Sequence, residues 1–276
     1  MALSRRLPLL ISIPHGGTGI PGEVRGKVAL DAAALQYYSD PGSLHLFGVH
    51  DLVDALVTSP VSRIIVDLNR PPYHRPPRHH DGVVKYLTSL GQDIWKEGMR
   101  PDLGDIHQLL LNHYFPYHAR IDSLLDRPGI AAALDCHTMV GVGLPGAPDQ
   151  GKKRPLICLG NSGDGQGSPK KGVLPTCPVS WIQDLARLFR ERFPAPGSVA
   201  INQPYSGGFI SNAHYWHKGI PWIQLEVNRS IFESDDANPE NGSQVDWVLL
   251  DEMKSVIREV LEEWSSGLPD RDDPVS

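Results

Sequence analysis

Six short apolar runs, each followed by a polar or glycine-rich turn, constrain the fold of this chain more than any other feature. They are rich in Ile, Val, Leu and Ala without strict alternation, a pattern typical of strands that are covered on both faces. We expect them to form a mostly parallel sheet. The runs are Leu7–Ile13, Arg63–Leu68, Ile130–Leu134, Leu156–Leu159, Val199–Ile201 and Trp222–Leu225.

Longer stretches with apolar residues at helical spacing lie between these runs, and they predict helices. They are Leu44–Val57, Asp105–Leu125, Val179–Phe193 and Gln244–Trp264. Alternating strands and helices favour an α/β fold with helices on both sides of the sheet, in three layers. Two segments rich in Pro, His or Gly, Arg70–His80 and Val140–Lys153, are predicted to be long loops, which are often functional in compact domains.

The length and composition indicate a globular chain without a nucleic-acid partner. With 276 residues, 40% of them hydrophobic, the chain can fill one large core, so we expect a single domain over residues 1–268 with a frayed polar tail at 269–276. The formal net charge is −6 with both signs interspersed. It offers no basic patch that could neutralise phosphates.

The N-terminus has two arginines before an apolar run, which is also how a signal peptide begins. That run stops at Pro14 without a small-residue cleavage site, so a buried strand is the better interpretation. No other apolar run approaches the roughly 20 residues needed to span a membrane. The three cysteines form no Cys-x-x-Cys pair, which fits a reducing cytoplasm and gives no support for a cysteine zinc site.

Polar side chains follow four of the predicted strands. Ligands gather at the carboxyl ends of the strands in an open parallel sheet, so we expect these residues to meet at one edge. They are His15 after the first run, Asp67, Asn69 and Arg70 after the second, Asp135 and His137 after the third, and Glu226 after the last.

Metal chemistry is the natural use of this set. A catalytic zinc takes three protein ligands, commonly two His and one carboxylate, and keeps a fourth position for water, which it activates. His15 and His137 are the best available ligands, and Glu226 is the best general base. Asp135, two residues before His137 on the same strand, points to the same side and could accept the free imidazole N–H or cap the strand end.

Each of these residues also has an ordinary structural explanation. His15 could be a turn residue, although Gly16 and Gly17 would let a ligand approach the backbone closely. Asp67 could simply end a strand. Arg70 could be exposed in its proline-rich loop, yet a guanidinium beside a metal is well suited to hold a substrate carboxylate.

The remaining motifs give no support for a second kind of active site. The glycine-rich segment 161–167 lacks the Gly-Lys-Ser/Thr ending of a phosphate-binding loop, so we interpret it as a flexible loop. His74, His79 and His80 are predicted to face solvent. A serine or cysteine hydrolase is disfavoured because there is no Gly-x-Ser-x-Gly motif and Cys136 should face away from His137.

Taken together, the segments resemble the N-formylglutamate amidohydrolase family over roughly residues 9 to 232. The most specific blocks are Asp67-Leu68-Asn69-Arg70 and Asp135-Cys136-His137. The others, in family order around them, are Ile13-Pro14-His15-Gly16-Gly17, Pro116-Tyr117-His118, Leu159-Gly160-Asn161, Gly207-Gly208-Phe209-Ile210 and Ile223-Gln224-Leu225-Glu226.

The resemblance implies a three-layer zinc-carboxypeptidase-like fold and a metal site of His, carboxylate and His with a Glu as base. His15, His137 and Glu226 carry over directly. Arg70, with Asn69 and Arg63, would hold the substrate's carboxylates, and His214 would line the pocket. Asp67 and Asp135 would both lie behind the metal-binding residues and support them.

The middle metal ligand is the least determined by the motifs. Related zinc hydrolases use His-x-x-Glu, but position 18 is Thr. The family has an aspartate ahead of its second helix, which aligns with Asp40, and Glu23 is the competitor. We favour Asp40.

We therefore expect a zinc-dependent hydrolase that cleaves N-formylglutamate, a small-molecule substrate. The unusual Pro71–His80 loop and Asn228-Arg229 after the base depart from the family pattern and could alter substrate choice. Alternatives are the same chemistry on another N-acyl amino acid or peptide, and a metal-free binding protein. The sequence does not distinguish zinc from other divalent ions or reveal the oligomeric state.

Overall fold

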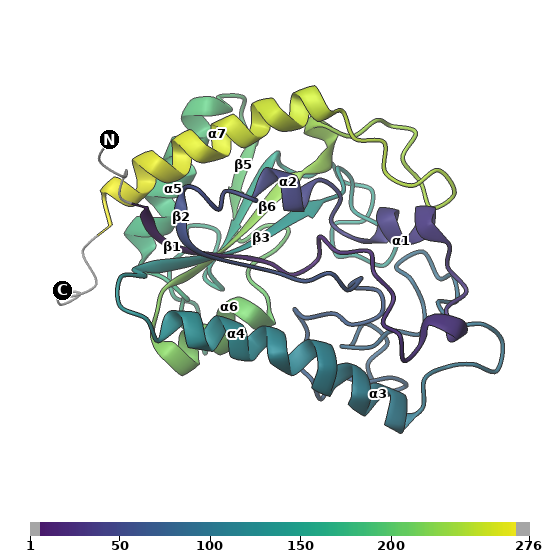
Figure 1. Ribbon diagram of the computed structural model, residues 1–276. Coiled ribbons are helices and arrows are strands. Elements are labelled where there is room, and N and C mark those ends of the chain that lie inside the picture. Colours follow the sequence, from purple (N-terminus) through teal and green to yellow (C-terminus); the bar gives the residue numbers. More distant parts are fainter. Residues whose placement is uncertain (1–5, 269–276) are drawn as a thin grey trace.

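A six-stranded sheet runs through the molecule in the strand order β2-β1-β3-β6-β4-β5 (Figure 1). The computed structural model describes residues 6–268, so the tail predicted at 269–276 lies outside the described residues. The strands are β1 (Leu7–Ile13), β2 (Val53–Thr58), β3 (Ala132–Met139), β4 (Ile157–Gly160), β5 (Val199–Ile201) and β6 (Trp222–Asn228).

The sheet is mixed but mostly parallel. Strands β2, β1, β3 and β6 run in one direction, whereas β4 is antiparallel to β6 and parallel to β5. The carboxyl ends of β1, β3 and β6 therefore meet at one edge, and in the β3–β6 ladder His137 lies opposite Glu226. This register brings two of the predicted site residues together.

Helices cover both faces of the sheet, as Figure 1 shows. On one face lie α2 (Ser43–Leu46), α5 (Val179–Arg192) and α7 (Trp247–Ser266); on the other lie α3 (Leu103–Leu109), α4 (Phe115–Leu125) and α6 (Phe209–Lys218). A π-helical turn (Leu110–Tyr114) joins α3 to α4, and α1 (Ala32–Tyr38) lies near the carboxyl edge. The predicted α/β class with three layers is confirmed.

The sheet separates two hydrophobic cores because successive side chains of a strand point to opposite faces. In β1, Leu9 and Ile11 pack in the core beneath α5 and α7, whereas Leu10 packs in the core that contains α4. All three side chains are fully buried. Because both faces of the sheet are covered, the strands have continuous apolar sequences instead of alternating apolar and polar residues.

Helix α7 shows how the sequence specifies the covering layer. Asp246 precedes the helix, and its side chain accepts hydrogen bonds from the N–H groups of Val248 and Leu249, which satisfies donors that a helix start leaves unpaired. The side chains that recur at helical spacing form its buried face, which packs on the sheet: Leu250, Met253, Ile257, Val260, Leu261 and Trp264.

Two sequence predictions of secondary structure are wrong. Leu44–Val57 is not one helix: only Ser43–Leu46 is helical, and Val53–Thr58 forms edge strand β2, in which Val53, Ala55 and Val57 are buried and the residues between them more exposed. Arg63–Leu68 is not a strand. Its backbone turns, with the N–H groups of Ile65 and Val66 donating to the Ser62 carbonyl.

The predicted strands Leu7–Ile13 and Val199–Ile201 occur with the predicted ends, and the other predicted elements occur with shifted ends, the helix predicted over Asp105–Leu125 being divided into α3, the π-helical turn and α4. The predicted loops over 70–80 and 140–153 contain no helix or strand. Strand β3 continues to Met139 and β6 to Asn228, so Asp135, His137 and Glu226 lie within the strands rather than after them. Every residue of β3 and β6 is buried, including these three polar ones. No helix in the described part of the chain is long and apolar enough to cross a membrane.

Candidate active site

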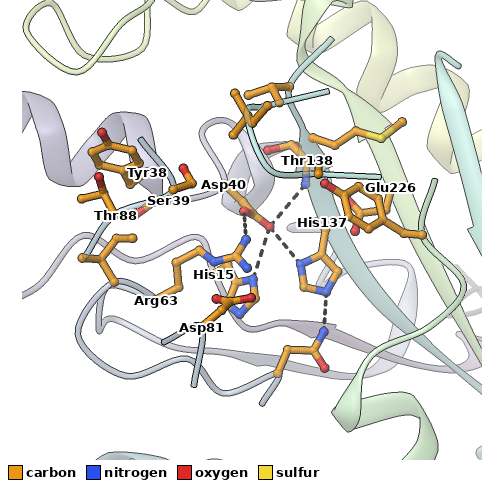
Figure 2. A pocket seen from close by; sticks show the side chains of 18 of the residues that line it. His15, Tyr38, Ser39, Asp40, Arg63, Asp81, Thr88, His137, Thr138 and Glu226 are labelled. Carbon is orange, nitrogen blue, oxygen red and sulfur yellow. Dashed lines mark hydrogen bonds and ion pairs between the residues drawn. The ribbon is translucent and has the colours of Figure 1, made fainter. Parts of the chain in front are cut away.

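A cavity of about 590 Å³ opens at the carboxyl edge of β1, β3 and β6 (Figure 2). Seven of the ten predicted site residues line it: His15, Asp40, Arg63, Asn69, Arg70, His137 and Glu226. Asp67 and Asp135 lie behind this lining and contact it through hydrogen bonds. The strand-end motifs thus converge as expected.

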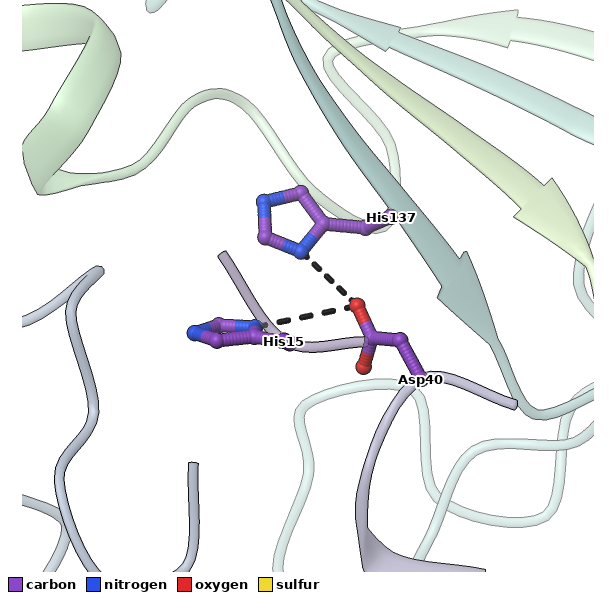
Figure 3. Close-up of side chains that lie close together, drawn as sticks. All are labelled: His15, Asp40 and His137. Atoms are coloured by element: carbon purple, nitrogen blue, oxygen red, sulfur yellow. Dashed lines mark hydrogen bonds and ion pairs between the residues drawn. The ribbon is translucent and has the colours of Figure 1, made fainter. Parts of the chain in front are cut away.

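His15, Asp40 and His137 form a candidate metal site. Each offers one ligand atom, and the three atoms lie within 4.8 Å of one another. Oδ2 of Asp40 is 2.9 Å from Nδ1 of His137 and 3.7 Å from Nδ1 of His15, and Figure 3 shows both rings turned toward this carboxylate. All three side chains are buried.

Local backbone geometry positions this group. His15 lies two residues after the end of β1, and its carbonyl accepts a hydrogen bond from the N–H of Asp40 at 2.9 Å, which fixes the segment after α1 beside the strand end. Gly17 packs against Ser59 and Pro60 so closely that a Cβ would lie 2.3 Å from the backbone of Pro60. The Gly16-Gly17 pair is therefore explained by packing of the chain against itself.

The residues fit a metal ion. Nδ1 of His15 is buried and has no hydrogen-bond partner among the described residues, which is costly unless a ligand satisfies it. Its Nε2 is 2.8 Å from Oδ1 of Asp67, so Nε2 carries the proton and Nδ1 presents a lone pair. Two imidazole nitrogens and one carboxylate are a common set for zinc and related ions.

His137 has the same arrangement. Its Nε2 is 3.1 Å from Oδ2 of Asp135 and 3.1 Å from Nδ2 of Asn69, which leaves Nδ1 facing Asp40. Burial alone would lower the pKa of His137, but the nearby carboxylates of Asp135 and Glu226 outweigh burial and raise this pKa well above its ordinary value. The ring therefore lies in a strongly negative environment that attracts a cation.

Cations hold the surrounding carboxylates in their ionised form. Burial would raise the pKa of Asp40, but Arg63 and the two histidines hold it well below its usual range. Burial likewise opposes ionisation of Asp67, yet Lys85, His15 and Arg63 keep its pKa well below the usual range. Nζ of Lys85 is 2.9 Å from Oδ2 of Asp67.

Glu226 differs from these carboxylates because its pKa is raised. Burial in the sheet raises this pKa to about 7, with Asp40 and Asp135 acting in the same direction against His137 and Arg63. Nε2 of Gln224 donates to Oε1 of Glu226 at 2.9 Å and orients it. A buried carboxyl that can change protonation near neutral pH, opposite a candidate metal ligand, has the properties of a general base.

The predicted carboxylate-binding residues are engaged to different degrees. Arg63 donates to Asp40 Oδ1 at 3.0 Å and to Asp67 Oδ2 at 3.4 Å. The Asn69 side chain donates to Asp135 Oδ2 at 2.8 Å, and its Oδ1 accepts from the N–H of Ile210 at 2.8 Å. Arg70 pairs with the exposed Asp81 at 2.6 Å, so Arg70 is the most readily available of the three.

Two residues considered in the sequence lie elsewhere. His214 on α6 is not among the residues that line the cavity; its ring contacts His118 at 2.9 Å and Asp122 at 2.8 Å. Glu23 accepts a hydrogen bond from Asn112 at 2.7 Å and takes no part in the candidate metal group. The geometry thus favours Asp40 over Glu23 as third ligand.

Comparison with known proteins places the chain in a family. The N-formylglutamate amidohydrolase family matches residues 7–232. The chain belongs to this family. It is accordingly a hydrolase that acts on amide bonds, as the sequence motifs predicted.

One curated relative is similar over most of the chain and another over about half of it. The N-formylglutamate deformylase of Pseudomonas aeruginosa is 28% identical over 270 residues, 93% of this chain and 92% of that protein. The Pseudomonas putida N-formylglutamate deformylase is 31% identical over 141 residues, 49% of this chain and 52% of that protein.

The fold is also found among solved structures. The N-formylglutamate amidohydrolase of Ralstonia eutropha superposes with a TM-score of 0.71 at 17% identity, covering 96% of both chains. A gene product of Agrobacterium tumefaciens gives 0.66 at 17% identity, covering 96% of this chain and 91% of that one. These likenesses show that the family fold is shared.

The family motifs do not point to every residue of the cavity. Lys85, Arg154, Tyr205 and Arg229 also line it. Arg229 carried a sequence signal, because it closes the strand-end segment that begins with Glu226. Lys85 and Arg154 carried none, since each follows a long loop whose path the sequence does not specify.

Proposed function

We propose that this amidohydrolase cleaves N-formyl-L-glutamate to formate and L-glutamate with a zinc-activated water. The observation that carries the proposal is the convergence of His15, Asp40 and His137 within 4.8 Å, beside a buried Glu226 whose pKa is about 7. Family membership supports the amide substrate, and the curated relatives are N-formylglutamate deformylases.

The metal would be held by Nδ1 of His15, Oδ2 of Asp40 and Nδ1 of His137. Three protein ligands with an open fourth position are typical of catalytic zinc sites, and a bound zinc supplies a Lewis acid and a water of lowered pKa. Asp67 and Asp135 fix the tautomer and direction of the two rings through their Nε2 atoms.

Glu226 would move the proton. As a carboxylate it accepts a proton from the attacking water, whose oxygen bonds to the formyl carbon. It then returns this proton to the amide nitrogen, and the C–N bond breaks to give formic acid and the amine, which become formate and the ammonium form of glutamate when the acid's proton passes to the amine. A pKa of about 7 suits both halves of this transfer. Gln224 keeps Oε1 of Glu226 oriented.

Arg70 would bind the substrate's α-carboxylate, with Arg63 and Asn69 in support. Its partner Asp81 is 68% exposed and also pairs with Lys85, so Asp81 keeps a cation when Arg70 turns to a substrate. Arg63 stays with Asp40 and Asp67, and the Asn69 amide stays with Asp135. Both therefore contribute mainly by positioning the metal ligands.

The test combines a substrate panel with elemental analysis. Purified wild type should contain about one zinc per chain and prefer N-formylglutamate among N-formyl and N-acetyl amino acids. His137→Ala should lose both metal and activity, whereas His50→Ala, at an exposed histidine, should keep both. A better substrate without an acidic side chain would refute the substrate assignment, and absence of metal after reconstitution would refute the mechanism.

A further inference from the structure

Unpaired polar atoms cluster around the cavity. In the part of the chain that the structure describes, five buried side-chain N or O atoms lack a hydrogen-bond partner, and four belong to residues that line the cavity. Such atoms are expected where a ligand completes the hydrogen bonding. The four are Nδ1 of His15, the hydroxyl of Tyr38, Oε1 of Gln224 and Nε of Arg229.

Arg229 is the cation in this group that the proposed reaction leaves unused. It follows β6 and is only 5% exposed. Its Nη1 donates to the carbonyl of Tyr37 at 3.2 Å, and its guanidinium carbon lies 5.6 Å from the centre of the Tyr37 ring. These contacts fix the guanidinium beside the end of α1.

The contacts of this guanidinium run through Nη1, which also lies 3.4 Å from Glu233, whereas Nε is buried and has no hydrogen-bond partner among the described residues. Glu233 itself accepts a hydrogen bond from Ser243. Nε–H and Nη2–H are the parallel pair of donors that bind a carboxylate in a bidentate manner.

The other three arginines that line the cavity differ in this respect. Arg63 donates to Asp40 and Asp67. Arg70 donates to Asp81 through both Nε and Nη2. The Nε and Nη2 atoms of Arg154 hold both oxygens of Asp149, at 2.7 and 3.1 Å. Of these four arginines in the described part of the chain, Arg229 is the one with a buried Nε that lacks a hydrogen-bond partner.

We propose that Arg229 binds the side-chain carboxylate of the substrate and so selects acidic N-acyl amino acids. This inference rests on the proposed function. The α-carboxylate is one carbon from the scissile nitrogen, so it must stay near the metal ligands, where Arg70 lies beside Asp67. The side-chain carboxylate of a glutamate lies two carbons farther from that nitrogen. Arg229 contacts Tyr37 and Glu233, which lie outside the metal group.

A purely structural role makes a different prediction. Arg229 also connects α1 to the end of β6, so its loss could disturb the cavity without any contact to substrate. In that case Glu233→Gln, which removes its ion-pair partner, should have the same effect as Arg229→Gln. In our proposal Glu233→Gln leaves the binding fork in place and does not weaken binding of an acidic ligand.

The experiment measures binding of L-glutamate and L-glutamine to the metal-loaded protein by calorimetry. These ligands have the same shape and differ in the side-chain charge. Arg229→Gln should weaken L-glutamate binding about 10- to 100-fold, the usual range for a charged hydrogen-bonded pair, and leave L-glutamine binding unchanged. Arg229→Lys, which keeps the charge without the fork, should give a smaller loss for L-glutamate alone.

Three outcomes would overturn the inference. In the first, Arg229→Gln weakens binding of L-glutamate and L-glutamine equally. In the second, Glu233→Gln weakens L-glutamate binding as much as Arg229→Gln does. In the third, the wild-type protein binds L-glutamate no more tightly than L-glutamine. Turnover of N-formylglutamate is measured separately. Absence of turnover with intact discrimination between the two ligands would refute the proposed reaction and leave the role of Arg229 standing.

Discussion

Oδ2 of Asp135 lies 3.1 Å from Nε2 of His137, which leaves Nδ1 of the same ring facing Asp40. Both residues belong to β3, where residues two apart share a face. The strand therefore supplies a candidate ligand together with the group that fixes its tautomer. A pair of this kind raises ligand basicity and restricts the ring to one orientation.

Asp135→Asn should weaken metal binding about 10- to 100-fold, because the amide no longer accepts the Nε2 proton as strongly. The dissociation constant would be measured by competition with a chromogenic chelator. Ser12→Ala is the matched control: the Ser12 hydroxyl donates to the other carboxylate oxygen of Asp135, Oδ1, at 3.1 Å. If both variants bind metal as tightly as wild type, Asp135 does not support the ligand.

Glu226→Gln should lower kcat by about 10²- to 10⁴-fold, because the amide cannot accept the proton of the attacking water. The metal content should stay at the wild-type level, since Glu226 is not one of the three candidate ligands. Steady-state kinetics and elemental analysis of the same preparation measure both quantities. Glu97→Gln, at an exposed position, is the control, and a kcat within tenfold of wild type would exclude Glu226 as the base.

The sequence could predict most of the fold and those site residues that lie at strand ends. His15, His137 and Glu226 follow or end apolar runs, and parallel strands bring their carboxyl ends together. Asp40 gave no such signal, because it follows the short helix α1 and is placed by a backbone hydrogen bond to His15. Only the resemblance to a family pointed to it.

The failures have local causes. Leu44–Val57 has apolar residues at helical spacing, but Val53, Ala55 and Val57 also alternate, and pairing with β1 makes the second pattern prevail. The Arg63–Leu68 segment is buried and apolar, yet it turns instead of joining the sheet. Periodicity cannot distinguish these cases, because tertiary contacts decide between them.

Arg70→Gln should weaken binding of L-glutamate and L-glutamine by similar factors, about 10- to 100-fold, because both ligands share the α-carboxylate. This contrasts with the selective loss expected for Arg229→Gln. Calorimetry with both ligands checks it, and Arg187→Gln, an exposed arginine on α5 paired with Glu191, is the control. Selective loss of L-glutamate would instead assign the side-chain carboxylate to Arg70.

His118 should make the folded protein less stable in acid. Burial, with the neighbouring His214, lowers the pKa of His118 to about 4 from an ordinary value near 6.5. Between these values the unfolded chain binds this proton and the folded chain does not. The contribution of His118 to the free energy of unfolding is therefore complete above pH 6.5 and decreases as the pH falls toward 4.

Urea unfolding at pH 7.5, 6.0 and 5.0 measures this effect in wild type and in His118→Gln. A glutamine can still donate to the carbonyl of Leu68, which His118 contacts through Nε2 at 3.0 Å. The variant should lose less stability between pH 7.5 and 5.0 than wild type, by about 1–2 kcal/mol. Because carboxylates titrate equally in both proteins, the difference isolates His118. Parallel loss in the two proteins would mean that His118 titrates normally when folded.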